Sequence, residues 1–283
     1  MLRDLGFRMQ SVDPIRSRAC LVVVPEVCVD GRLSAGPLMT MIDVLAGSLV
    51  GRVLLPDWMA TSQLSLHLDD PPAMGDVTAD AVVVRNGRTT VVVDVALHQG
   101  GPDGAVGRRF GEAMLTFVRL PRRDSNLDMS QFEQVFGEWS TFAVDGSGLE
   151  RPYLSSLGAR AGDSVSGVLR VEVTDYVRNS FGAVNGGVVA AVAAAAAEDA
   201  AGAVLGARTA AADVQVHYLT QGRVGPVVTS SRVVRSGPGG VLVRVEVADA
   251  GLDDAGDGHA ATPDRGRRLM VVAHVLCVPG DHS

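Results

Sequence analysis

Asp43 stands inside an apolar segment, with MTMI before it and VLAG after it. Loss of solvation raises the pKa of such a carboxylate and hydrogen bonds from Thr61 and Asn179 would lower it, and the sequence leaves open which effect is larger. The group could activate a water as a general base or attack a carbonyl directly. Gly186 and Gly187 begin a second apolar segment, which is rich in alanine. If that segment is a helix, its first N–H groups are unpaired and could stabilise an oxyanion. The sequence therefore contains a candidate base and a candidate oxyanion-binding helix start.

These candidate residues lie in two copies of one pattern. TSQLSLHLDD (61–70) matches AADVQVHYLT (211–220) at an offset of 150, and residues 83–95 match residues 233–245 at the same offset. Residues 33–47 match residues 184–198 at an offset of 151. Several blocks in one order at nearly one offset indicate an internal duplication.

Each copy predicts the same order of elements: a strand, a glycine-bearing turn, a long helix and a run of strands. The helix is hydrophobic nearly all round, which favours burial on every side. Asn86-Gly87 and Ser236-Gly237 suit hairpin turns between strands. The expected ranges are 18–29, 36–55, 60–68, 77–86, 89–98 and 112–120, then 168–177, 187–205, 210–218, 226–235, 240–248 and 268–278.

The length of 283 residues favours two domains. We assign residues 1–120 to the first and 158–283 to the second. Residues 121–157 mix charge, glycine and proline and are interpreted as a linker, in which MSQFEQVFGEW (129–139) predicts an amphipathic helix. In the second copy, residues 251–266 are expected to form a long polar loop before the last strand.

Composition excludes several classes of protein. A net charge of −7, a pI near 5.3 and 4% aromatic residues argue against nucleic acid as a partner. Three cysteines are too few for a disulfide framework. The first ten residues lack the apolar run of a signal peptide, and the apolar run 188–197 is too short to cross a bilayer. We therefore expect a cytoplasmic protein that does not enter the membrane.

The segment NSFGAVNGGVV (179–189) resembles a signature of hotdog-fold acyl-CoA thioesterases of the phenylacetyl-CoA and 4-hydroxybenzoyl-CoA type. That signature has Asn, then His-Gly-Gly six residues later, and Asp or Glu nine residues after the His. A Ser or Thr begins the next strand. The resemblance covers about 100 residues of each half. It implies an α+β fold of two tandem hotdog domains, each an antiparallel sheet wrapped around a central buried helix.

In that family two hotdog units share one site, and this chain divides the signature between its halves. The second half supplies Asn179, Gly186 and Gly187, with Asn185 in place of the His, while the first half supplies the carboxylate and hydroxyl, Asp43 and Thr61. The opposite pairing joins Cys28 and Ser34 to Ala194 and Ala211, and it has no carboxylate. The resemblance thus implies one working site and one degenerate site per chain. Because an amide carries no proton, any acid–base role of the family His is absent.

The implied activity is hydrolysis of an acyl-CoA thioester, with coenzyme A as part of the substrate and no separate cofactor. Arg85, Arg88 and Arg235 flank the repeated hairpins and are candidates for contact with coenzyme A phosphates. Solvated hairpin charges are the alternative. The family also implies side-by-side pairing of the two sheets and assembly of chains into a homo-oligomer.

Each candidate residue also has a purely structural interpretation. Asp43 could be a surface polar residue, Asn179 could cap a turn, and Thr61 could simply favour a strand. Gly186-Gly187 could serve close packing. His67 and His217 occupy matching strand positions and are interpreted as structural, and no His or Cys spacing fits a metal site.

Two other functions stay open at this stage. The first is a non-catalytic acyl-CoA-binding or regulatory protein, which the missing His and the degenerate site favour. The second is a hotdog dehydratase or hydratase, which ranks last because neither half places a His at the start of its helix.

Overall fold

Two long apolar helices form the centre of the computed structural model, which describes residues 1–101, 106–121, 135–162, 165–251 and 267–280. They are α2 (Ala35–Leu54) and α4 (Gly186–Leu205), each within one residue of its expected range. The expectation that the second apolar segment is too short to cross a bilayer is wrong as to length, because α4 continues past Glu198 to 20 residues. Both helices are long and apolar enough to cross a membrane, but 67% of the apolar stretch of each is buried inside the molecule. They are therefore core helices of this fold.

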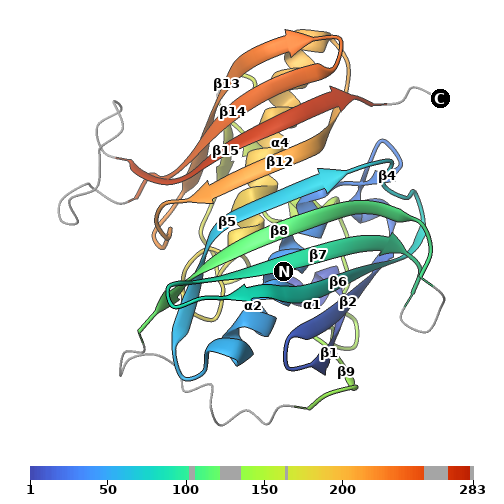
Figure 1. Ribbon diagram of the computed structural model, residues 1–283. Coiled ribbons are helices and arrows are strands. Elements are labelled where there is room, and N and C mark those ends of the chain that lie inside the picture. The colour runs from blue at the N-terminus through green and yellow to red at the C-terminus, as the bar shows by residue number, and fades with distance from the viewer. Residues whose placement is uncertain (102–105, 122–134, 163–164, 252–266, 281–283) are drawn as a thin grey trace.

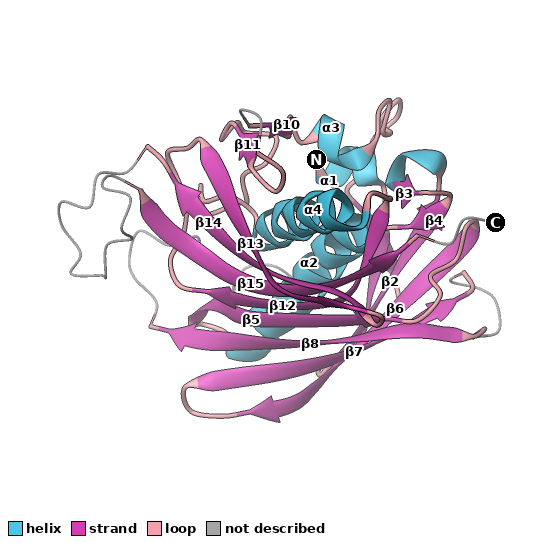
Figure 2. Cartoon of the chain, turned by 90° about the horizontal axis from the view of Figure 1, so that it is seen from above, coloured by secondary structure: helices cyan, strands magenta, loops and turns pink. Residues whose placement is uncertain are grey.

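The described strands form one antiparallel sheet of 13 strands, in the order β10-β11-β13-β14-β15-β12-β5-β8-β7-β6-β2-β1-β9. Figure 2 shows the sheet curving around α2 and α4. The strands of the first half are β1 (Arg8–Asp13), β2 (Arg16–Val23), β5 (Trp58–Leu68), β6 (Gly75–Asn86), β7 (Thr90–Gln99) and β8 (Arg109–Leu120). Those that follow are β9 (Trp139–Thr141), β10 (Arg160–Ala161), β11 (Leu169–Val171), β12 (Thr209–Tyr218), β13 (Val227–Gly237), β14 (Gly240–Asp249) and β15 (Arg268–Pro279).

Three short helices and a small ribbon complete the described fold. They are α1 (Leu2–Leu5), the 3-10 helix η1 (Pro25–Val27), α3 (Tyr153–Ser156) and the two-stranded ribbon of β3 (Cys28–Val29) and β4 (Arg32–Leu33). The ribbon leads directly into α2, so it fixes where that helix begins.

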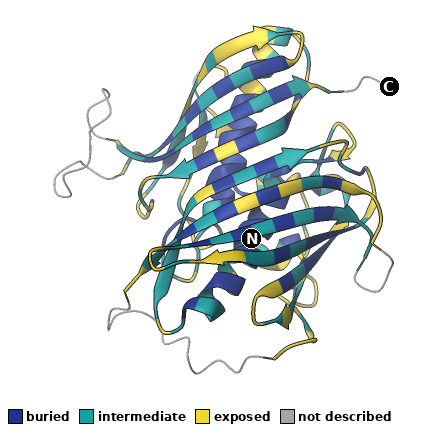
Figure 3. Cartoon of the chain, viewed as in Figure 1, coloured by how far each residue is buried: buried dark blue, intermediate teal, exposed yellow. Residues whose placement is uncertain are grey.

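The two halves join where β5 pairs with β12, with His67 opposite Asp213 and Gln63 opposite His217. This seam makes the two sheets continuous, as Figure 1 shows. It confirms the expected α+β fold, in which each half wraps an antiparallel sheet around a buried helix. Along the strands, buried and exposed residues alternate (Figure 3), because successive side chains point to opposite faces.

Several local expectations differ from the structure. The first strand ends at Val23 rather than Val29, because Pro25 starts a 3-10 turn and has no N–H to donate to a neighbouring strand. Of the expected strand 168–177, only Leu169–Val171 is a strand. Residues 174–177 form a turn instead, in which the Val177 N–H donates to the Thr174 carbonyl. The expected helix 129–139 lies mainly outside the described residues, and its described end, 135–139, is not helical. Residues 252–266 of the expected loop also lie outside them.

Part of the predicted linker belongs to the core. Tyr153 of α3 is 3% exposed, and its hydroxyl lies 2.6 Å from the Thr40 hydroxyl on α2. The domain boundaries themselves stay a prediction.

The two core helices approach closely at the start of α4. A Cβ on Gly187 would lie 2.5 Å from the Thr40 Cα and 2.8 Å from the Met39 carbonyl oxygen. Both are backbone atoms that cannot move aside, so only glycine fits there. This contact sets how near α4 comes to the middle of α2.

We predict that Gly187→Ala destabilises the fold, because the added methyl forces the helices apart. A decrease of about 1–3 kcal/mol in the free energy of unfolding is expected for such overpacking, measured by chemical denaturation. Gly148→Ala is the matched control, since a Cβ there meets nothing within 4 Å. Equal stability of the two variants would contradict the close approach.

Candidate active site

Asp43 of α2 meets the start of α4 at the centre of the molecule. The residue is 8% exposed, and its carboxylate accepts two hydrogen bonds. The Thr61 hydroxyl on β5 donates to Oδ1 at 2.9 Å, and the Gly187 N–H donates to Oδ2 at 3.0 Å. The structure therefore brings together an acid and a hydroxyl from the first half and a helix tip from the second.

Burial decides the protonation of this carboxylate. Desolvation raises the pKa of Asp43 to about 6, while the hydrogen bonds from Thr61 and Gly187 partly oppose that rise. The sequence left open which effect is larger, and burial is the larger one. A carboxyl group with this pKa is mostly ionised at pH 7 and is basic enough to take a proton from water.

The tip of α4 needs glycine for a second reason. A Cβ on Gly186 would lie 2.9 Å from Asp43 Oδ2, so any side chain there would push the carboxylate away. The Gly187 N–H is occupied by Asp43, whereas the Gly186 N–H has no acceptor among the described residues. The first N–H of the helix is therefore left to donate to a substrate oxygen, with the helix dipole behind it.

The two asparagines of the signature bind backbone groups. Asn185 caps α4, since its Oδ1 accepts from the Val188 N–H at 3.2 Å. Asn179 Oδ1 accepts from the N–H groups of Phe181 and Ala183, at 2.9 and 3.1 Å. In the described part of the chain no hydrogen bond joins Asn179 to Asp43, so Asn179 shapes the turn that leads into the helix.

That turn carries an aromatic contact between the halves. The ring of Phe181 lies edge-on to Trp58 at the start of β5, with centroids 4.3 Å apart and planes at 70°. Trp58 is three residues before Thr61, so the pair joins the halves at the end of β5 that carries Thr61. Aromatic edge contacts of this kind fix the relative position of the segments that carry them.

Tyr218 of β12 is a site residue that the sequence did not reveal. Its hydroxyl donates to the Gly186 carbonyl at 2.9 Å, on the same tip that Asp43 contacts. Burial, and then the nearby Asp43 carboxylate, raise the pKa of Tyr218 well above its usual value, so the hydroxyl keeps its proton. The repeat gave no signal, because the matching residue of the first half is Leu68.

The opposite pairing of the halves forms a second composite position. A cavity of about 50 Å³ lies there, and its lining includes Cys28, Ser34 and Ala194. The absence of a carboxylate at position 194 leaves this space, but Glu198 enters it from one turn further along α4. Glu198 Oε1 accepts from the Ala211 N–H at 2.9 Å, and burial raises the pKa of Glu198 to about 7. The sequence-based view of this position as lacking any acid therefore missed Glu198.

The three candidate arginines do not converge. Arg85 on β6 pairs with Val92 on β7, Val92 pairs with Thr116 on β8, and Thr116 pairs with Gln63 on β5. Arg85 is therefore level with the end of β5 that carries Thr61. Arg88 lies in the adjoining hairpin. The register of the paired strands β13, β14, β15, β12 and β5 puts Arg235 level with His67, which lies near the other end of β5.

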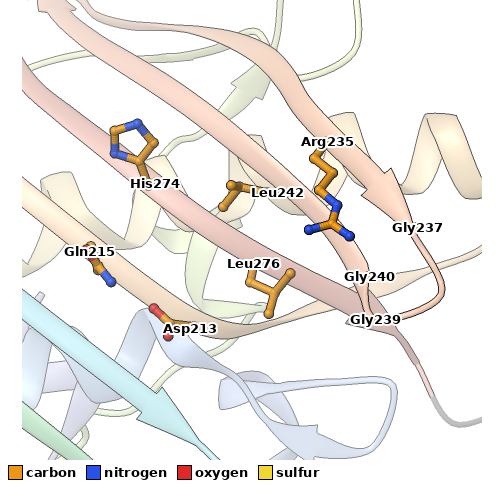
Figure 4. A pocket seen from close by; sticks show the side chains of 9 residues that line it. All are labelled: Asp213, Gln215, Arg235, Gly237, Gly239, Gly240, Leu242, His274 and Leu276. Carbon is orange, nitrogen blue, oxygen red and sulfur yellow. The ribbon is translucent and has the colours of Figure 1, made fainter.

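Arg235 borders a separate basin of about 570 Å³ on the sheet face that points away from α4. Figure 4 shows Arg235 and His274 on either side of Leu242, with Asp213 and Gln215 on β12. Strand alternation places these side chains opposite the buried Val241 and Val243. The basin and the Asp43 site therefore lie on opposite faces of the sheet.

Known protein families match both halves. The acyl-CoA thioesterase N-terminal domain family matches residues 176–275, and the thioesterase superfamily matches residues 30–105. Together the two matches span more than half of the chain. The chain belongs to the hotdog-fold thioesterase superfamily. It has the double-hotdog form, and members of this superfamily are thioester hydrolases.

Solved structures show the same double-hotdog fold over nearly the whole chain. The acyl-ACP thioesterase of Bacteroides thetaiotaomicron is 14% identical with a TM-score of 0.54, covering 93% of this chain and 98% of its own. A Lactobacillus plantarum protein assigned as an oleoyl thioesterase is 12% identical with a TM-score of 0.59, covering 94% and 97%. Among curated proteins, no sequence matches this hotdog thioesterase significantly.

Within the described residues of the chain, no group of three or more His, Cys, Asp or Glu side chains is arranged to hold a metal ion.

We predict that Asp43→Asn flattens the pH dependence of stability. The pKa of Asp43 is 3.8 in the unfolded reference and about 6 in the fold. Between these values the folded state binds more protons, so stability falls as pH rises from about 4 to 6. The asparagine variant should lose about 2–3 kcal/mol less than the natural chain over that range.

Denaturant titrations at pH 4, 5, 6 and 7.5 measure this difference. Glu198→Gln should remove a similar slope, between its reference value of 4.5 and about 7. Parallel curves for Asp43→Asn and the natural chain would show that Asp43 titrates normally.

Proposed function

We propose that this protein hydrolyses acyl-coenzyme A thioesters at one composite site between its halves. The observation that carries the proposal is the Asp43 carboxylate held between the Thr61 hydroxyl and the Gly187 N–H. A buried base beside a helix tip with a free N–H supplies what thioester hydrolysis requires. These requirements are an activated water and a donor for the oxyanion.

In the proposed reaction the thioester carbonyl oxygen accepts from the Gly186 N–H. Asp43 takes a proton from water as the water oxygen bonds to the carbonyl carbon, giving a tetrahedral oxyanion. The oxyanion then collapses and the C–S bond breaks. The thiolate takes the proton from Asp43, so the products are a carboxylic acid and free coenzyme A thiol. Direct attack of the Asp43 carboxylate on the carbonyl carbon is the alternative use of the same residue.

The second composite position is proposed to be degenerate. It has Ala194 and Ala211 where the working site has Asp43 and Thr61. Glu198 stands where the first half has Gly47, and its Oε1 accepts from the Ala211 N–H. The Glu198 carboxylate thus contacts the backbone of β12, whereas the Asp43 carboxylate contacts the tip of the other core helix.

The hairpin between β6 and β7 is proposed to bind coenzyme A phosphates. Arg85 is three strands from β5 and level with Gln63, which puts it on the order of 14 Å from the site across the sheet. Arg88 lies in the same hairpin and adds a second guanidinium. Arg235 is level with the far end of β5, so we assign it no part in binding the same substrate.

A non-catalytic acyl-CoA-binding protein is the second candidate. The observation in its favour is Asn185, which caps the helix at the position where the family carries a His. Under this alternative the chain binds acyl-CoA in calorimetry but releases no thiol from any acyl group. Aromatic, short and long acyl-CoA substrates, with acyl-carrier-protein thioesters, form the panel that separates the two.

We predict that Asp43→Ala abolishes thiol release, because it removes the base. Thiol release by the natural chain should fall at acid pH with a midpoint near 6, as the carboxylate gains its proton. Thiol detection with a chromogenic disulfide measures both effects, and thermal unfolding confirms that the variant is folded. Unchanged turnover in Asp43→Ala would refute the site.

We predict that Glu198→Gln leaves turnover unchanged from that of the natural chain, because the second position takes no part in the reaction. Glu198 is the matched control for Asp43, since it is also a carboxyl group with a raised pKa on a core helix. Loss of half the turnover or more in Glu198→Gln would mean that both composite positions work.

A further inference from the structure

One peptide unit at the tip of α4 is held from both ends. Its carbonyl, on Gly186, accepts from the Tyr218 hydroxyl at 2.9 Å. Its N–H, on Gly187, donates to the Asp43 carboxylate at 3.0 Å. Tyr218, this peptide and Asp43 therefore form a continuous chain of hydrogen bonds.

The sheet seam positions the tyrosine. Tyr218 ends β12, and its neighbour His217 pairs with Gln63 on β5, two residues from Thr61. The hydroxyls of Tyr218 and Thr61 thus approach the tip and its acid from two adjacent strands that belong to different halves. Leu68 stands at the matching position of the first half, so the degenerate site has no such hydroxyl.

Hydrogen bonds in series strengthen one another, because each polarises the next. A donor on the Gly186 carbonyl makes the Gly187 N–H a stronger donor to Asp43. It also restrains rotation of that peptide, and with it the direction of the neighbouring Gly186 N–H, which no described residue accepts. The raised pKa of Tyr218 keeps the hydroxyl protonated, so it acts as a donor throughout the neutral range.

We propose that Tyr218 is a positioning residue of the hydrolytic site, which tunes the basicity of Asp43 and aims the Gly186 N–H through the peptide between Gly186 and Gly187. The inference rests on the proposed function for its effect on rate. Its effect on Asp43 is independent of turnover.

The test compares Tyr218→Phe with Tyr153→Phe in the full chain. Tyr153 is the matched control, because its hydroxyl is hydrogen-bonded to Thr40 on α2 and touches neither glycine of the tip. Carbon-13 NMR of the aspartate carboxyl groups follows the titration of Asp43, assigned by its absence in Asp43→Asn. Thiol release gives kcat and KM from the same samples.

Tyr218→Phe should raise the pKa of Asp43, because a weaker Gly187 donor stabilises the carboxylate less. It should lower kcat about tenfold with little change in KM, since the loss is one of alignment rather than of substrate contact. Tyr153→Phe should reduce the unfolding temperature and leave the Asp43 titration in place. An unshifted Asp43 titration in Tyr218→Phe overturns the proposal, whereas an unchanged kcat beside a shifted titration refutes the effect on rate.

A second variant keeps the test decisive if Tyr218→Phe does not fold. The chain has three tyrosines, at positions 153, 176 and 218, so Tyr153→Phe with Tyr176→Phe leaves only Tyr218. Incorporating 3-fluorotyrosine there makes the hydroxyl a stronger donor and should lower the pKa of Asp43, opposite to the effect of phenylalanine. A shift in the same direction as phenylalanine, or none, contradicts the proposal. If no acyl-CoA is hydrolysed by the natural chain, the proposed function fails while the titration still tests Tyr218.

Discussion

The contact between the Asp43 carboxylate and the tip of α4 is the constraint on which the rest of the structure depends. A charge moved into an apolar core is costly unless it is hydrogen-bonded, and two donors serve this one. Those donors come from different halves of the chain, so the site exists only while the halves stay joined. The β5–β12 seam holds them together, and the missing Cβ of Gly187 lets the helices come close enough. The contacts that hold the two halves together therefore also form the site.

The duplicated chain has two composite positions between its halves, and the two halves have diverged in opposite directions. The first half keeps the acid and the strand hydroxyl, and the second keeps the glycine tip with its cap. At a further matched position the first half has Gly47 and the second has Glu198, which is bound to the Ala211 backbone. Asp43 thus contacts the tip of the other core helix, while the longer Glu198 side chain contacts the β12 backbone. Each half is specialised for one face of a single site.

Patterns that repeat along the chain could be predicted from the sequence. The core helices lie within one residue of expectation, because an unbroken apolar segment bounded by Ser34 or by Asn185-Gly186 leaves little freedom. The pairing of Asp43 with Gly187 followed from the divided signature. Tyr218 did not follow, since its partner is a backbone carbonyl, which no sequence displays. Glu198 was missed because it lies one helical turn from the position that the family specifies, and Pro25 ended a strand that alternation alone would have continued.

The absence of the family His is compatible with hydrolysis for a reason that lies in the leaving group. A thiol with a pKa of about 8.5 leaves readily as a thiolate, so the reaction needs no strong acid beside the sulfur. What it does need is a base for the water and a fixed donor for the oxyanion. Asn185 serves the second requirement, because its side chain caps α4 and holds the tip at a defined position. The proton can then be handled by Asp43 alone, whose burial sets its pKa near the working range of a base.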